Sequence, residues 1–308
     1  MKKRILGRTG LEVGNLGLGT EYLVGQDQNV YSECIKICID SGINYIDVIF
    51  AFPDYRDRLG KAMHGLQDRF VIAGHIGCAE TDGQCRKSRD ANECSDLFSD
   101  LLERLDIDRA QIAMIQFVDA DRDYERVMGP GGLYELAQRL KQEGKADHIG
   151  ISIHDYASAG RAAASGAYDV IMFPLGIILA PIPVDEFSSS CRENNVGVVA
   201  MKFFGGGRLF RLSGTLGIDP SRLVGFPLVN PDVSTNELQR AISGMNNMPP
   251  AADLKKFTER IQGRPENTYA DLGASASSCT ECGVCETRCP FEVPVMARMM
   301  EAADVFSG

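Results

Sequence analysis

Short apolar runs alternate with longer amphipathic stretches along most of the chain, a pattern that predicts repeated strand–helix units. The apolar runs that predict strands are Asn15–Leu18, Asn44–Val48, Phe70–Gly74, Gln111–Phe117, His148–Ile151, Val170–Phe173 and Gly197–Met201. An eighth strand is expected within Glu237–Ser243, where the pattern is weak. The amphipathic stretches predict helices at Tyr31–Ser41, Ala91–Leu105, Leu133–Glu143, Tyr156–Ser165 and Val184–Asn194.

This alternation favours an α/β fold, specifically a (β/α)8 TIM barrel, whose functional sites lie at the carboxyl ends of the strands. A doubly wound open sheet is the alternative, although no G-x-G-x-x-G follows the first strand. Asp54 is a candidate N-cap and Pro183 a candidate helix start. We expect the barrel over residues 1–262, a Gly-, Pro-, Ala- and Ser-rich linker over 263–278, and a separate segment over 279–308.

Composition narrows the class of protein. The 308 residues carry a net charge of −10, which argues against nucleic-acid binding because that requires a basic face. No apolar stretch is long enough to span a bilayer, and the basic N-terminus lacks the apolar core of a signal peptide. Ten cysteines without a secretory signal indicate a reducing compartment with metal-bound or free thiols, so a cytoplasmic protein is expected.

Four of these cysteines lie within eleven residues near the C-terminus and are followed by a proline. Cys279, Cys282, Cys285 and Cys289 have the C-x2-C-x2-C-x3-C-P spacing of bacterial ferredoxins, which predicts a 4Fe–4S cluster. A zinc knot is the alternative, but zinc sites favour two separated C-x2-C pairs. In two-cluster ferredoxins the fourth cysteine serves the other cluster. Either Cys289 closes this cluster or a cysteine of the barrel does, and we favour Cys289.

The remaining cysteines fall into two groups. Three follow the third expected strand with a C-x6-C-x8-C spacing that matches no metal motif: Cys78, Cys85 and Cys94. The other three lie among apolar residues and are expected in the core: Cys34, Cys38 and Cys191.

Several segments resemble, in order, those of the aldo-keto reductases. Arg4–Val13 resembles the hairpin that closes the bottom of the family's barrel, and Gly42–Asp47 with Leu59 and Gly60 resembles its second βα unit. Glu143–His154 resembles the entry to its fifth strand, and Met201–Gly207 the loop after its seventh. The resemblance covers roughly residues 3–260, and the cysteine-bearing tail matches the branch of the family with a ferredoxin-like C-terminus.

The family reduces carbonyls with hydride from NADPH, using Asp, Tyr, Lys and His around the substrate oxygen. The resemblance places Asp47 on the family's aspartate, but Phe52 on its tyrosine, His75 on its lysine and Gln116 on its histidine. Phe52 has no acidic proton. We therefore expect an Asp47–His75 acid/base pair with Gln116 orienting the substrate. The alternative is a satisfied salt bridge at an inactive site.

Other residues compete for roles in this site. Tyr55 is an alternative proton donor, unless its ring packs at a helix start. His154 is either a substrate contact or a hydrogen-bonded strut.

The resemblance also predicts how a nicotinamide would be held. Ser152 matches the serine that binds the carboxamide, whereas Ile153, Met172 and Met201 replace the family's Asn, Gln and Tyr. A pyrophosphate site or a plain turn is expected at Gly205, Gly206, Gly207 and Arg208. Binding of NADP(H) or NAD(H) is therefore an open alternative.

These features predict an iron–sulfur oxidoreductase of aldo-keto reductase-like build that acts on a small carbonyl or alcohol. Its cluster would exchange single electrons with the barrel site or with a protein partner of the ferredoxin or flavodoxin type. One alternative is a lyase or isomerase with a structural cluster. Another is an inactive electron-transfer or binding module that keeps the barrel as a scaffold.

Overall fold

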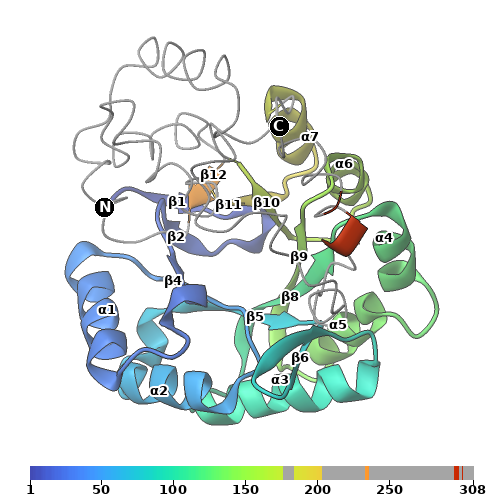
Figure 1. Ribbon diagram of the computed structural model, residues 1–308. Helices are drawn as coiled ribbons and strands as arrows, with labels where there is room; N and C mark the ends of the chain where they lie inside the picture. Colours follow the sequence, from blue (N-terminus) through green and yellow to red (C-terminus); the bar gives the residue numbers. More distant parts are fainter. Residues whose placement is uncertain (176–183, 203–232, 236–294, 298–299, 301–308) are drawn as a thin grey trace, which may run out of the picture.

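The fold is built on one curled parallel sheet (Figure 1). The computed structural model describes residues 1–175, 184–202, 233–235, 295–297 and 300. The sheet contains β3 (Leu18–Gly19), β4 (Tyr45–Val48), β5 (Val71–Ile76), β8 (Ala110–Val118), β9 (Ala146–Ile153), β10 (Val170–Pro174), β11 (Gly197–Met201) and β12 (Val233–Thr235). Each of these strands pairs in parallel with the next one along the chain.

The consecutive strand order decides between the two expected architectures. A doubly wound sheet reverses its strand order at a switch point, and this sheet shows no reversal. The α/β fold is therefore TIM-barrel-like. The predicted strands correspond to β3 through β11, and β12 adds the eighth. The segment Glu237–Ser243, where the eighth strand was expected, lies outside the described residues, as do residues 263–294.

Helices cover the outer face of the sheet (Figure 1). They are α1 (Gln28–Ser41), α2 (Pro53–Met63), α3 (Ala91–Leu105), α4 (Asp121–Met128), α5 (Leu133–Gln142), α6 (Tyr156–Ala164) and α7 (Val184–Glu193). Short 3-10 turns lie at η1 (Gly7–Thr9), η2 (Glu21–Leu23) and η3 (Gln67–Arg69). The described part of the chain contains no helix that is both long and apolar enough to cross a membrane.

The prediction that Asp54 is a helix N-cap is wrong. Phe52 is the N-cap of α2 and Pro53 occupies its first turn, so Asp54 already lies inside the helix. Its carboxylate accepts a hydrogen bond from Arg58 Nε at 2.9 Å, one turn further along. Proline suits the first helical position because it lacks the N–H that would be unsatisfied there. Helix α7 begins directly after Pro183, which itself lies outside the described residues.

A hairpin closes the amino end of the barrel, as expected from the sequence. Its strands β1 (Lys3–Ile5) and β2 (Glu12–Gly14) pair antiparallel. Leu6 and Val13 of this hairpin pack with the inward side chains of the barrel, which are Tyr45, Val71, Ala73, Ile112, Met114, Val170, Met172, Val199 and Met201. The approach is so close that a Cβ on Gly197 would lie 2.7 Å from the Leu6 side chain. The barrel interior is therefore packed from its amino end upwards.

Strand alternation places a polar layer above this apolar filling. Side chains two residues apart share a face of the sheet. Continuing the inward rows one step toward the carboxyl ends leads from Tyr45 to Asp47, from Ala73 to His75 and from Met114 to Gln116. All three polar residues are buried. The carboxyl end of the barrel interior is therefore lined by a carboxyl group, an imidazole and an amide.

Candidate functional site

Three polar side chains form one hydrogen-bonded chain across the ends of β4, β5 and β8. His75 Nε2 lies 2.8 Å from Asp47 Oδ1, and His75 Nδ1 lies 2.9 Å from Gln116 Oε1. Gln116 Nε2 lies 3.2 Å from the carbonyl oxygen of Ile49. The sequence had assigned all three to one site, and the structure brings them together.

The partners fix the direction of each hydrogen bond. The Ile49 carbonyl only accepts, so the Gln116 amide donates to it and presents its oxygen to His75. His75 Nδ1 must then carry a hydrogen and donate to Gln116 Oε1. A second proton lies between His75 Nε2 and Asp47 Oδ1, on one atom or the other. The pair therefore stores a proton in a fixed orientation.

Exposure shows which end of the pair faces outward. The side chain of His75 is 0% exposed and that of Asp47 is 5% exposed. Both ring nitrogens of His75 are already engaged. A proton leaving the pair toward a substrate must therefore pass through the Asp47 carboxyl group. His75 lies on the buried side of Asp47, where its ring can hold and orient that proton.

A backbone irregularity lies beside Gln116. The β8–β9 register shifts between Ile115 and Val118, and Phe117 has a φ of 60°. Positive φ is costly for a bulky side chain, and such strain persists where the surroundings enforce it. Here Arg89 Nη2 donates to the Phe117 carbonyl oxygen at 2.6 Å. This bulge sets the end of β8, and no local sequence pattern had indicated it.

Tyr55 is buried and its phenol is already committed. Its hydroxyl is hydrogen-bonded to Thr20 Oγ1. Thr20 uses its single hydroxyl hydrogen to donate to the Asp47 backbone carbonyl at 2.5 Å, so Tyr55 is the donor toward Thr20. Burial raises the pKa of the Tyr55 phenol. The structure thus places Tyr55 as a support for the end of β4, with its hydroxyl hydrogen directed at Thr20.

Comparison with known proteins decides the family. A sequence profile described as the Aldo/keto reductase family matches residues 13–220. The chain belongs to the aldo/keto reductase family. Membership makes it an oxidoreductase of this family.

Solved structures share the fold. The protein PA4992 of Pseudomonas aeruginosa, assigned to the aldo-keto reductases, has 24% sequence identity and a TM-score of 0.64, and the match covers 79% of this chain and 92% of that one. The aldo-keto reductase AKR11C1 of Bacillus halodurans, in its holo form, has 20% identity and a TM-score of 0.70, over 85% of this chain and 96% of that one. No curated protein sequence matches the chain.

Aldo-keto reductases typically bind NAD(P)(H), and one of the residues expected to hold it is described. Ser152, in β9, is 5% exposed, and its Oγ lies 3.8 Å from the sulfur of Met201. Met172 pairs with Ser152 in the β9–β10 register. Two methionines thus lie beside Ser152, where the resemblance gives the family Gln and Tyr. The expected pyrophosphate residues, Gly205, Gly206, Gly207 and Arg208, lie outside the described residues.

A second polar group lies at the same end of the barrel. Lys202 Nζ lies 2.7 Å from His154 Nε2, and His154 Nδ1 lies 2.5 Å from Asp119 Oδ1. These residues follow β11, β9 and β8 directly. Sequence reasoning had noted only His154. The hydrogen bond with Lys202 and the ion-pair contact with Asp119 hold His154 as a strut would, and they also bring a lysine to the barrel mouth.

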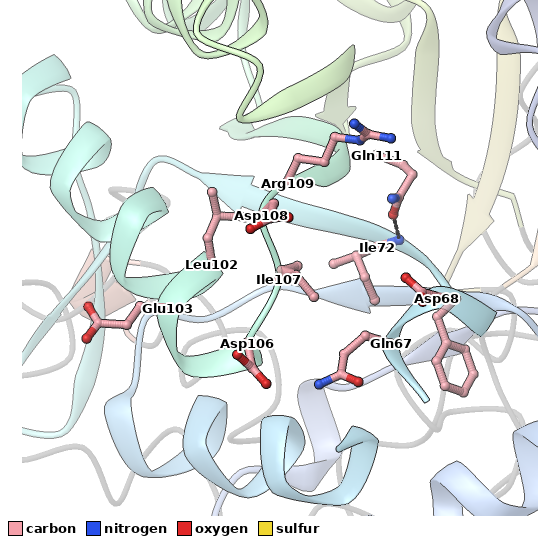
Figure 2. A pocket seen from close by; sticks show the side chains of 11 residues that line it. Gln67, Asp68, Ile72, Leu102, Glu103, Asp106, Ile107, Asp108, Arg109 and Gln111 are labelled. Atoms are coloured by element: carbon pink, nitrogen blue, oxygen red, sulfur yellow. Dashed lines mark hydrogen bonds between the residues drawn. The ribbon is translucent and has the colours of Figure 1, made fainter. Parts of the chain in front are cut away.

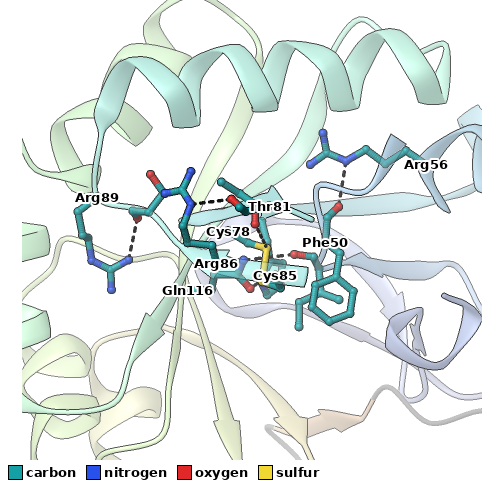
Figure 3. Close-up of a disulfide and its surroundings, with 12 residues drawn as sticks. Phe50, Arg56, Cys78, Thr81, Cys85, Arg86, Arg89 and Gln116 are labelled. Atoms are coloured by element: carbon teal, nitrogen blue, oxygen red, sulfur yellow. Dashed lines mark hydrogen bonds between the residues drawn. A yellow bond between two sulfur atoms is a disulfide. The ribbon is translucent and has the colours of Figure 1, made fainter. Parts of the chain in front are cut away.

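The cysteines of the barrel differ in part from expectation. Cys78 and Cys85 form a disulfide across the hairpin of β6 (Cys78–Thr81) and β7 (Gln84–Lys87), which corrects the expectation of metal-bound or free thiols (Figure 3). Figure 3 shows it near Gln116 and Phe50. Cys38, Cys94 and Cys191 are buried, as expected for Cys38 and Cys191, and burial raises the pKa of Cys38 to about 12.

No metal site is formed by the described residues, where no three His, Cys, Asp or Glu side chains converge as a ligand set. The predicted ligands Cys279, Cys282, Cys285 and Cys289 lie outside the described residues.

A cavity of about 730 Å³ lies at the opposite end of the barrel (Figure 2). Its lining includes Ile72 and Gln111, near the amino ends of β5 and β8, and polar groups such as Asp68 and Arg109. Gln111 Oε1 accepts from the Ile72 amide at 2.7 Å. In barrels of this kind the amino-end face contributes to stability and the carboxyl-end face to catalysis. Asp47, His75 and Gln116 lie at the other, carboxyl end of the strands.

Proposed function

We propose that this member of the family is an iron–sulfur oxidoreductase that acts on a small carbonyl or alcohol, with the Asp47–His75–Gln116 chain as its proton source. The observation that carries the proposal is the hydrogen bond between His75 Nε2 and Asp47 Oδ1, 2.8 Å apart and buried at the carboxyl end of the strands. That end carries the active sites of such barrels.

The proton step follows from the orientation of the chain. When a carbonyl carbon is reduced, its oxygen must gain a proton. Phe52 offers none, and the proton of Tyr55 points at Thr20. Asp47 can donate the shared proton, after which His75 remains fixed by Gln116. Water or buffer then restores the proton through the slightly exposed Asp47 carboxyl group.

Two cofactors are compatible with the proposal. A nicotinamide, when bound, supplies hydride, and Ser152 is the described residue that would contact its carboxamide. A 4Fe–4S cluster, when bound, carries single electrons. The spacing of Cys279, Cys282, Cys285 and Cys289 supports such a cluster, and a ferredoxin- or flavodoxin-type protein would be its partner.

The test begins with anaerobic purification and absorption and EPR spectra. The protein is then titrated with NADPH, NADH and dithionite and assayed against a panel of small aldehydes, ketones and alcohols. His75→Ala should lower kcat on any substrate found by about 100-fold or more, the typical contribution of general acid catalysis. The matched control is His148→Ala, since His148 lies at the amino end of β9 beside Asp169.

Unchanged turnover in His75→Ala would overturn the proton-source role. Turnover without any nicotinamide or electron donor would instead favour the lyase or isomerase alternative. A cluster-free protein would remove the iron–sulfur part of the proposal and leave the barrel chemistry standing.

A further inference from the structure

The Asp119, His154 and Lys202 group has the geometry of an activated nucleophile. Lys202 Nζ can only donate, so it donates to His154 Nε2 at 2.7 Å. His154 Nε2 must then carry a lone pair, and the ring hydrogen lies on Nδ1, 2.5 Å from Asp119 Oδ1. A nucleophile, a base within hydrogen-bond reach and a third group that orients the base form the general pattern of nucleophilic catalysis.

The contacts give a proton a direct path within this group. His154 Nε2 can accept a proton from the Lys202 ammonium, which leaves a neutral amine. The resulting imidazolium lies directly beside the Asp119 carboxylate, which stabilises its charge. The side chains of His154 and Asp119 are 28% and 19% exposed, so the group is partly sheltered but accessible.

The backbone positions Lys202 in an unusual way. Among the described residues, positive φ outside glycine occurs at Asp82, Asp106 and Asn195, residue types that tolerate it, and at Phe117 and Lys202. The last two, with φ of 60° and 55°, both lie at strand ends of the barrel mouth. The amide of His154 donates to the Val118 carbonyl at 3.2 Å and ties the end of β9 to β8. Backbone strain of this kind is concentrated at functional sites.

We infer that Lys202 is a nucleophilic amine that forms a Schiff base with small aldehydes or keto acids, with His154 as its base and Asp119 as the orienting group. His154 Nε2, which has taken one proton from the Lys202 ammonium, passes it to the carbonyl oxygen as the amine attacks the carbonyl carbon and a C–N bond forms. His154 Nε2 then takes a second proton from the nitrogen and gives it to the new hydroxyl group, which leaves as water as the C=N bond of a protonated Schiff base forms. No oxidant or reductant takes part, and the reaction is reversible.

This inference shares no residue with the Asp47–His75–Gln116 chain. It goes beyond the proposed oxidoreductase function, because covalent capture of a carbonyl is a different reaction from its reduction. It also does not depend on the cysteine-bearing segment.

Reductive trapping tests it directly. The full chain is incubated with propanal or pyruvate and sodium cyanoborohydride, and peptide mass spectrometry measures the alkylated fraction of each lysine. Lys202 should be modified at least about tenfold faster than the exposed Lys61, in line with the usual effect of a positioned base. Because both lysines are measured in one wild-type sample, the comparison does not depend on a variant that folds.

Variants sharpen the result. His154→Gln and Asp119→Asn should reduce the labelling of Lys202 to the level of Lys61, and Lys202→Arg should abolish labelling at this position. His75→Ala should leave it unchanged, which separates this inference from the proposed function. Labelling of Lys202 that is no faster than that of Lys61, or that is unaffected by His154→Gln, would overturn the inference.

Discussion

At the residue scale, two buried tyrosines near β4 differ in what their hydroxyl groups meet. The rings of Tyr31 and Tyr55 lie 6.4 Å apart. The Tyr55 hydroxyl donates to Thr20, which holds the Asp47 backbone carbonyl. The Tyr31 hydroxyl is buried and finds no hydrogen-bond partner in the described part of the chain. The pair therefore offers a matched test of what one phenol contributes.

Tyr55→Phe should lower the free energy of unfolding by about 1 kcal/mol, because Thr20 Oγ1 loses a buried donor. Tyr31→Phe should change it by less than about 0.5 kcal/mol, since no described hydrogen bond is lost. Urea unfolding of the two variants measures the difference. Both should keep wild-type turnover, and a 100-fold loss in Tyr55→Phe would instead make Tyr55 the proton donor.

The residues of the proton chain were predictable and those of the lysine group were not. Asp47, His75 and Gln116 were predicted because the resemblance matches them to the family's catalytic positions, and the structure places all three inside strands. Asp119 and Lys202 lie one residue past strand ends, and the conformation of Lys202 depends on a positive φ that no local pattern indicates. Only the folded backbone brings them to His154.

At the scale of elements, α2 and α3 approach at a single glycine. A Cβ on Gly60 would lie 2.0 Å from the backbone carbonyl oxygen of Arg104. Gly160 provides the contrast, because it lies within α6 and a Cβ there would meet nothing within 4 Å. A glycine-to-alanine substitution should therefore change the free energy of unfolding in opposite directions in the two helices.

Gly60→Ala should destabilise the protein by about 2–3 kcal/mol, since backbone must move to admit the methyl group. Gly160→Ala should stabilise it by about 0.5–1 kcal/mol, because alanine loses less backbone entropy in a helix. Thermal unfolding midpoints that shift in opposite directions would agree with this packing. A neutral Gly60→Ala would contradict it.

The observed boundaries of helices agree best with the predicted ones where the apolar periodicity of the sequence is strong. Helix α3 has the predicted limits, and α1 begins at Gln28, ahead of the predicted Tyr31. The hairpin β6–β7 was missed, because its short strands carry mostly polar side chains that read as a loop. The bulge in β8 was missed for the same kind of reason, since it depends on Arg89, which is distant in sequence.

At the scale of the whole molecule, a barrel with a proposed proton source is joined in one chain to a cysteine motif of ferredoxin spacing. The disulfide between Cys78 and Cys85 engages the two barrel cysteines of the β6–β7 hairpin. Neither sulfur is then available as a cluster ligand. This pairing favours Cys289 as the fourth ligand of the proposed cluster.

Cys289→Ser should lower the iron content and alter the EPR signal of the anaerobically purified protein, because hydroxyl replaces thiolate as a ligand. Cys85→Ser should leave both unchanged, as a matched single-cysteine control. Iron quantitation on the two variants measures this. Iron loss in Cys85→Ser alone would assign the fourth ligand to the barrel.

The β1–β2 hairpin, which closes the amino end of the barrel, has a consequence for the kinetics of turnover. Leu6 and Val13 fill the amino end, so Asp47 and Lys202 are both reached from the opposite end. Substrate must then enter, and product must leave, through the carboxyl end of the barrel. A slowly departing product blocks the next arrival, and product inhibition should be competitive with respect to substrate. The closed amino end of the barrel thus requires product to leave before the next substrate molecule can bind.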